Sequence, residues 1–206
     1  MEQVKLDKIV KLHSLWLMNE PKGKQANLRN ADLQYADLQY ADLRNADLLN
    51  ADLLNANLRR ADLQSADLRS ADLQRANLQR ANLQYANLQR ADLRNADLRN
   101  ADLQYANLQY ANLRRADLLN ADLRNADLQR ANLRSADLQG ANLDFSSWPL
   151  WCGSLNVKVD ERIAIQLLYH ALAVNCDSKA FNKIKKLKSV KNLVNKFRRI
   201  PEVPEL

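Results

Sequence analysis

The chain has 206 residues, of which 47% are hydrophobic and 27% charged, and its formal net charge is +7 at pH 7. This composition can form a core and excludes a chain that is disordered throughout. No apolar run reaches membrane-spanning length and no signal-peptide pattern opens the sequence, so we expect a cytoplasmic protein without a transmembrane segment. Cys152 and Cys176 are far apart and lack metal-ligand spacing, which argues against a disulfide framework or a metal site.

The positive charge lies at the two ends of the chain. Residues 26–145 contain 15 Arg and 16 Asp, a net charge of −1, whereas residues 1–25 carry +2 and residues 146–206 carry +6. Nucleic-acid binding by the middle of the chain is therefore not expected, because such binding needs a basic surface.

Residues 1–25 are predicted to form an N-terminal cap helix and a linker. The helix is expected over residues 3–18, and Pro21 and Gly23 end it. Its apolar residues at helical spacing are Val4, Ile9, Leu12 and Trp16. The helix would cover the open edge of whatever follows it.

Residues 26–145 consist of 24 consecutive pentads of the form Ala-(Asp/Asn)-Leu-x-x, with Asp in 15 pentads and Asn in nine. In an α-helix a five-residue step advances by a net angle of about 140°, so the leucines would define no single face. In a flat strand an odd step would place successive leucines on opposite faces. The chain must therefore bend once per pentad, which gives a closed coil with Ala and Leu inside.

The second position of each pentad is suited to a turn, because short Asp and Asn side chains bond to nearby backbone groups. The repeat contains no Pro and one Gly, Gly140. We therefore expect the corners to use turn types that accept ordinary residues.

The pentad signature resembles that of the pentapeptide-repeat family over residues 26–145. The resemblance implies an all-β solenoid, a right-handed quadrilateral β-helix of about six coils with four pentads in each, here with α-helical caps at both ends. In that register a core ladder is formed by Leu28, Leu48, Leu68, Leu88, Leu108 and Leu128. Residues 13–17, 23–28, 151–155 and 166–170 resemble the ends of uncharacterised bacterial and phage members of the family.

With four pentads per coil, residues 20 apart share a column on the surface. Asp32, Asp52, Asp72 and Asp92 form an acidic run, and Arg94, Arg114 and Arg134 form a basic run on the same side. A candidate interaction surface contains Tyr85 stacked on Tyr105, Tyr110 on the adjoining face, and the outward-facing Leu49 and Leu54. The alternative is that these are scattered surface apolar residues, which are normal in soluble proteins.

Residues 146–206 are predicted to close the coil and to form C-terminal helices. Trp148 and Trp151 are expected to form a lid over the open end. The last helix is amphipathic and basic, and its apolar residues include Phe181, Ile184, Leu187, Leu193 and Phe197. We expect it to form a homodimer, and binding of nucleic acid or a membrane surface is the alternative.

The repeat contains no His, Cys, Lys, Glu or Thr, and His13 and Cys152 outside it lack activating partners. We therefore expect no enzymatic activity and no cofactor. The leading hypothesis is a structural or interaction protein, a rigid rod that presents variable residues to an unknown protein partner. The family resemblance implies a second hypothesis, a DNA mimic that regulates or protects DNA gyrase or another type II topoisomerase. The near balance of Asp and Arg departs from such a mimic, which needs a continuous negative field.

Overall fold

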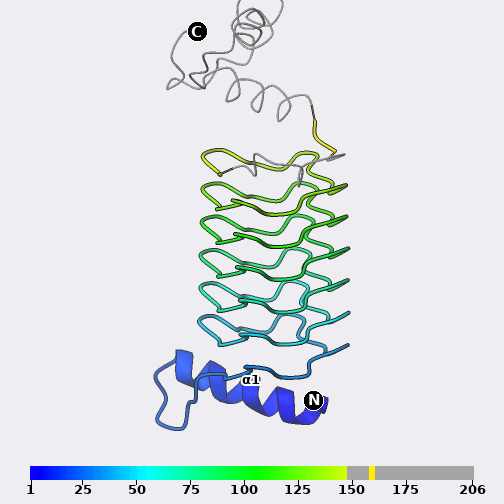
Figure 1. Cartoon of the computed structure of the whole chain (residues 1–206). Helices are drawn as coiled ribbons and strands as arrows, with labels where there is room; N and C mark the ends of the chain where they lie inside the picture. Colours follow the sequence, from blue (N-terminus) through cyan, green and yellow to red (C-terminus); the bar gives the residue numbers. More distant parts are fainter. Residues whose placement is uncertain (148–157, 161–206) are drawn as a thin grey trace, which may run out of the picture. The chain divides into compact units, whose positions relative to one another are not determined.

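The computed structural model describes residues 1–147 and 158–160, which contain one helix, α1, followed by a coil of short parallel β-bridges (Figure 1). The chain divides into two units, Met1–Lys158 and Val159–Leu206, and the description below concerns the first. None of the helical structure in the described part is long and apolar enough to cross a lipid bilayer. The predicted lid and the C-terminal helices lie outside the described residues.

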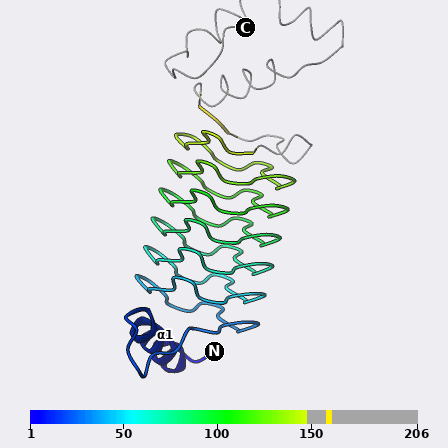
Figure 2. The same cartoon turned by 90° about the vertical axis from the view of Figure 1, so that its left-hand side faces the viewer.

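The bridges join second-position residues of pentads that are 20 residues apart, from Asn27↔Asp47 to Asp127↔Ser147. Twenty residues are four pentads, so each circuit has four corners, and successive circuits stack in register (Figure 2). We number the circuits from coil 1, residues 26–45, to coil 6, residues 126–145. A last bridge joins Asp137 to Lys158 after the segment that is not described.

The first and third positions of the pentads fill the interior. All six leucines of the ladder that begins at Leu28 and ends at Leu128 are 0–1% exposed. The alanines beside them are also buried, except Ala31 and Ala41 in the first coil. Each buried Leu contributes roughly 1.5–3 kcal/mol relative to an exposed one. The small side chain of Ala suits the first position, which is buried beside the stacked leucines in most pentads.

All five N–H groups of a pentad have hydrogen-bond acceptors. In the pentad 86–90, the second, third and fifth N–H groups donate to main-chain carbonyls of the neighbouring coils at 2.8–2.9 Å. The N–H of Ala86 closes a β-turn on the carbonyl oxygen of Leu83 at 3.0 Å. The fourth N–H, of Gln89, has no backbone acceptor and donates to Oδ1 of Asn87 at 3.2 Å.

This bond from the fourth N–H to the second side chain occurs in all 24 pentads, at 3.0–3.3 Å. Only an oxygen on a short side chain two residues earlier reaches this N–H group. That geometry explains why the second position is always Asp or Asn. It also leaves the second terminal atom, Oδ2 or Nδ2, available for contacts on the surface.

The fifth position of every pentad has a positive φ, from 52° at Asn30 to 69° at Gly140. The expectation of turns that accept ordinary residues is therefore wrong. Positive φ at this place in a β-turn belongs to types that favour Gly or Asn. Of the 24 fifth-position residues, 23 are not glycine, and they include Tyr, Arg, Ser and Phe.

The physical reason is the direction of the peptide unit between the fourth and fifth residues. The carbonyl oxygen of Gln89 accepts from the N–H of Ser70 in the coil below, while the N–H of Arg90 donates to Gln109 in the coil above, at 3.0 and 2.9 Å. This peptide therefore lies along the stacking direction, and the fifth residue turns the chain with a left-handed conformation. Such a conformation is unfavourable for a residue with a Cβ atom, and it persists because both neighbouring coils fix it.

α1 spans Gln3–Leu17 and lies against the first coil, close to the predicted bounds of 3–18 (Figure 1). Leu6 and His13 are its fully buried residues. Val4, predicted on the packing side, is 81% exposed, so that assignment is wrong. Two residues of an α-helix span about 200°, so a helix that buries Leu6 must turn Val4 toward solvent.

Gln3 bonds to the free backbone edge of the first coil. Its Nε2 donates to the carbonyl oxygen of Asp37 at 2.8 Å, and its Oε1 accepts from the N–H of Asp37 at 3.0 Å. The amide side chain thus takes the place that a neighbouring strand would take at an unpaired edge.

His13 joins α1 to the start of the repeat. The N–H of Ala26 donates to its Nδ1 at 3.0 Å, so Nε2 carries the proton and donates to the carbonyl oxygen of Arg44, also at 3.0 Å. Its ring stacks on Trp16 at 5.4 Å between ring centroids. Both ring nitrogens are occupied and the side chain is buried, which leaves no free nitrogen for catalysis or metal binding.

The turn bond is tested by replacing Asn87. Asn87→Ala removes the acceptor of the Gln89 N–H, and we expect a loss of about 1 kcal/mol in the free energy of unfolding, measured with denaturant. Asn87→Asp keeps the oxygen and should be close to neutral. Equal losses in the two variants would contradict the assigned role of Oδ1.

The pH dependence of His13 provides a second test. Burial lowers the pKa of His13 below its ordinary value of 6.5. The unfolded chain therefore binds the proton more readily, and the stabilisation from neutral His13 is complete above pH 6.5 and is lost as the pH falls through the lower, folded-state pKa. His13→Gln should abolish this part of the pH dependence, measured as the difference in melting temperature between the two proteins. If the difference in melting temperature between the two proteins stayed constant from pH 7 to about pH 5, the assigned role of neutral His13 would be wrong.

Candidate interaction surface

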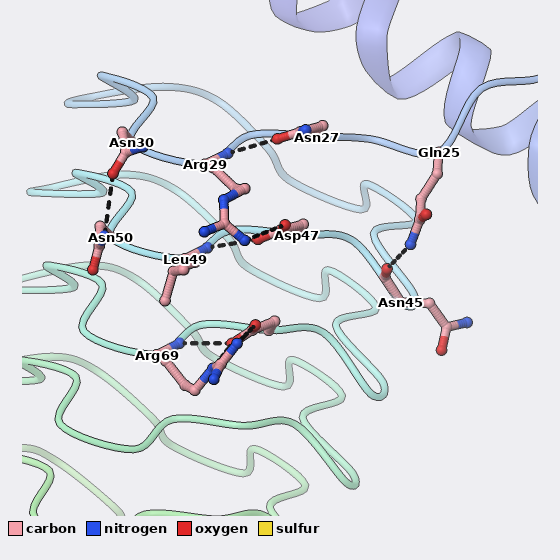
Figure 3. Close-up of polar contacts among 10 residues, drawn as sticks. Gln25, Asn27, Arg29, Asn30, Asn45, Asp47, Leu49, Asn50 and Arg69 are labelled. Carbon is pink, nitrogen blue, oxygen red and sulfur yellow. Dashed lines mark hydrogen bonds and ion pairs between the residues drawn. The ribbon is translucent and has the colours of Figure 1, made fainter.

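The fourth and fifth positions of the pentads form the variable outer surface. The register of 20 residues divides them into four faces, which begin with the pentads at Ala26, Ala31, Ala36 and Ala41. Each face repeats once per coil, so a column contains residues separated by 20. In Figure 3, Arg29, Leu49 and Arg69 follow one another in such a column on the first face.

Tyr85 and Tyr105 occupy adjacent coils at the corner of the fourth face. Their ring centroids are 4.9 Å apart and the ring planes differ by 3°, which is a stacked pair. The two residues are 54% and 49% exposed. The two rings form an exposed aromatic pair on a polar surface, and each ring covers one face of the other.

Tyr110 lies at the next corner, on the first face, between two arginines. The guanidinium carbons of Arg90 and Arg130 lie 5.8 and 5.4 Å from the centroid of its ring, within the range of cation–π contacts. Arg130 also donates to the hydroxyl of Tyr110 at 3.1 Å. Tyr110 was expected on this surface from the sequence, whereas its contacts with Arg90 and Arg130 were not, although both arginines are 20 residues from it.

Leu49 and Leu54 are separate from the tyrosines. Both are fourth-position residues of coil 2 and are half-buried, whereas Tyr85, Tyr105 and Tyr110 belong to coils 3 to 5. No column contains both groups. The five residues proposed from the sequence as one surface therefore form at least two clusters.

Arginines at the fourth position pair with aspartates at the second position of the same pentad. Arg44 contacts Asp42 and Arg69 contacts Asp67, each at 2.6 Å, and the bond with the guanidinium lowers the pKa of each carboxyl group. The same pair forms in three further pentads, at Arg94, Arg99 and Arg124. These pairs are half-exposed and contribute little to stability individually. Their effect is to neutralise charge locally.

The remaining charges are unevenly distributed around coils 4 to 6. The first two faces there, residues 86–95, 106–115 and 126–135, carry six Arg and two Asp, a net charge of +4, and we call this half the basic sector. The other two faces, residues 96–105, 116–125 and 136–145, carry two Arg and six Asp, a net charge of −4, and form the acidic sector. The balance of the whole repeat therefore hides two local surfaces of opposite charge.

Several predicted sites fall outside the described residues. They are the lid, the free thiols and the dimer helix: Trp148, Trp151, Cys152, Cys176, Phe181, Ile184, Leu187, Leu193 and Phe197. Within the described residues, no group of three or more His, Cys, Asp or Glu side chains is arranged to hold a metal ion.

The family model for pentapeptide repeats matches this chain in eight copies, over overlapping segments that run from residue 26 to residue 144. The chain belongs to the pentapeptide repeat family. Pentapeptide repeat proteins fold as right-handed quadrilateral β-helices and are generally non-enzymatic scaffolds. Comparison with curated protein sequences gives no match.

Solved structures similar to this pentapeptide repeat protein include HetL, a protein involved in heterocyst differentiation regulation from the cyanobacterium Nostoc sp. strain PCC 7120. The identity is 33% over 64% of this chain and 73% of HetL, with a TM-score of 0.32. Rfr23 from the cyanobacterium Cyanothece 51142 is 37% identical over 53% of this chain and 60% of its own, with a TM-score of 0.20. QnrB1, a plasmid-mediated fluoroquinolone resistance protein, is 22% identical over 69% of this chain and 86% of its own, with a TM-score of 0.42.

A double-mutant cycle tests the tyrosine stack. Tyr85→Ala and Tyr105→Ala, measured singly and together by denaturant unfolding, should show a coupling free energy of about 0.5–1.5 kcal/mol, because the two rings contact each other. The pair Tyr40 and Tyr105, in coils 1 and 4, should show none. Absence of coupling in the first cycle would mean that the stack does not form in solution.

Proposed function

We propose that this pentapeptide repeat protein is a non-enzymatic structural and interaction protein, a β-helical rod that presents its fourth- and fifth-position side chains to a protein partner. One observation carries the proposal. The first three positions of every pentad are used by the fold itself, two in the core and one in the turn bond. The widest variation is at the other two positions, while the second position varies only between Asp and Asn, so specific recognition by the rod depends mainly on the fourth and fifth positions.

The finer architecture belongs to this proposal. We infer a right-handed rod of about six coils, with α1 as its N-terminal cap in residues 1–25, the rod in 26–145 and a closing segment with helices in 146–206. The 20-residue register and the bonds from Gln3 and His13 to the first coil support the first two parts. A cytoplasmic location and a homodimer through the C-terminal helices rest on the sequence pattern.

The surface around Tyr85, Tyr105 and Tyr110 is the part of the rod that we expect to contact a protein partner. Tyr and Arg are the residues most enriched at interface hot spots. Holding Arg90 and Arg130 against Tyr110 reduces the entropy that these long side chains would lose on binding.

Regulation or protection of DNA gyrase or another type II topoisomerase by DNA mimicry is the second candidate. The acidic sector is the observation that favours it, because its net charge of −4 on two faces is a local negative field. The basic sector on the other side of the same coils argues against mimicry by the whole rod. A third candidate, nucleic-acid or membrane binding by the last helix, rests on its sequence alone.

Affinity capture from bacterial lysate with the full-length chain tests the proposal. A specific partner should be retained by the native protein and lost from the variant with Tyr85, Tyr105 and Tyr110 changed to Ser. Tyr35 and Tyr40, exposed tyrosines of coil 1, provide the matched control, and their change to Ser should leave retention intact. Equal retention by native and variant proteins would remove this surface from the proposal.

The mimic hypothesis has its own readout in a supercoiling assay with purified topoisomerase. An effect that disappears when the aspartates of the acidic sector become Asn would support it, since Asn preserves the turn bond and removes the charge. No effect at a large molar excess of protein would remove the hypothesis.

A further inference from the structure

The basic sector has the features of a polyanion-binding surface. Its arginines are Arg90, Arg94, Arg114, Arg115, Arg130 and Arg134, and its aspartates are Asp92 and Asp127. The leucine-filled interior separates this sector from the acidic sector. Because salt screens exposed charges over about 8–10 Å, a ligand on one side of the rod responds mainly to the charges of that side.

Within the described residues, Arg94 is the one arginine of this sector that forms an ion pair. Arg114, Arg115 and Arg134 are exposed and form no ion pair with any residue in the described part of the chain. In the pentads of Arg114 and Arg134 the second residue is Asn, Asn112 and Asn132 respectively. In the pentads of Arg94, Arg99 and Arg124 the second residue is an aspartate, which neutralises the arginine. The Asn side chain keeps the turn bond through Oδ1 and leaves the guanidinium free.

Arg90 and Arg130 are positioned on either side of Tyr110, one coil apart from it in each direction. Contact with the ring limits the conformations of both guanidinium groups, so less entropy is lost when they bind an anion. Tyr110 itself is 45% exposed between the two guanidinium groups.

We propose that the basic sector binds the phosphate backbone of nucleic acid without reading its sequence. The exposed centre of the sector is Tyr110, which is 45% exposed and flanked by Arg90 and Arg130. The other exposed groups of the sector are mainly arginines, so charge supplies most of the binding, and charge alone gives little affinity between two proteins. A polyphosphate is different because arginines that contact it release condensed counterions. Duplex DNA has one charge per about 1.7 Å of its axis, whereas an extended acidic peptide has one per about 3.5 Å.

This inference goes beyond the proposed protein partner, although the two surfaces share Arg90, Tyr110 and Arg130. It revises the expectation from total charge that the rod would not bind nucleic acid. The net charge of −1 over residues 26–145 is summed over all four faces, and a ligand does not contact all four faces at once. The net charge of +4 on the basic sector is the relevant value, because the 20-residue register places six arginines on one side of three coils.

The repeat contains a matched control for the test. The pentads 56–60 and 111–115 have the same sequence, Ala-Asn-Leu-Arg-Arg, but the first is on the third face of coil 2 and the second lies in the basic sector. Arg114→Gln/Arg115→Gln and Arg59→Gln/Arg60→Gln therefore remove equal charge from identical local sequences. Both retain the basic C-terminal segment, whose own binding is the same in the two proteins.

The measurement is fluorescence anisotropy of a labelled, blunt-ended DNA duplex with full-length protein, at salt concentrations between about 50 and 200 mM. Each lost phosphate contact should weaken binding about eightfold at about 0.1 M salt and reduce the slope of log K against log salt by about one. We expect this effect for Arg114→Gln/Arg115→Gln, a near-native result for Arg59→Gln/Arg60→Gln, and retention of binding by Arg114→Lys/Arg115→Lys. Thermal unfolding of each variant establishes that the fold is retained.

Three results would overturn the proposal. No weakening by either Gln variant would assign DNA binding to the C-terminal segment. Equal weakening by both would mean that binding depends on the total charge of the rod and not on the basic sector. Tighter binding of a labelled polyglutamate peptide than of the duplex at the same salt, lost in Arg114→Gln/Arg115→Gln, would identify the ligand as an acidic protein instead.

Discussion

The structure depends on one local hydrogen bond in each pentad, from the N–H of the fourth residue to the side-chain oxygen of the second residue. Four of the five N–H groups in a pentad have backbone acceptors, either in a β-turn or in a neighbouring coil. The fourth does not, and a corner without an acceptor would leave a polar group unsatisfied in every pentad. The Asp or Asn oxygen supplies this acceptor in all 24 pentads, so the chain can bend every five residues without Pro and with one Gly.

The stacking of coils stabilises a left-handed conformation at the fifth residue, which an isolated turn with a side chain there would avoid. Each fifth residue has a positive φ, and at 23 of the 24 corners it carries a side chain. Asn tolerates this conformation better than most residues and occupies eight corners, but Arg, Tyr and Ser occupy most of the others. Because the peptide before the fifth residue is bonded to the coils on both sides, the left-handed conformation is held at every corner. The corners are therefore open to functional variation, although their backbone is fixed.

The surface charge of the rod depends on whether the second residue of each pentad is Asp or Asn. Asp and Asn are equivalent in the turn bond, so the choice between them adjusts surface charge without changing the backbone. Asp42 and Asp67 bind the arginine of their own pentad, whereas Asn112 leaves Arg114 unpaired. A rod with almost no net charge can thus present a basic side and an acidic side in the same three coils.

The sequence by itself determined the repeat, the inward-facing Ala and Leu and the exclusion of a helix or flat strand, because each follows from the period of five residues. It also determined the start of α1, from the helical spacing of apolar residues before Pro21. It could not determine the left-handed corners, since the peptide direction that requires them is set by bonds between coils. Nor could it show that Val4 faces solvent or that His13 is buried, because both depend on which side of α1 meets the first coil. The circuit of 20 residues was expected from the family resemblance and not from the period of five, and the stacking of backbone hydrogen bonds establishes it. The tertiary structure alone decided which arginines pair with an aspartate and which remain unpaired, because those contacts form only between side chains held in place by the stacked coils.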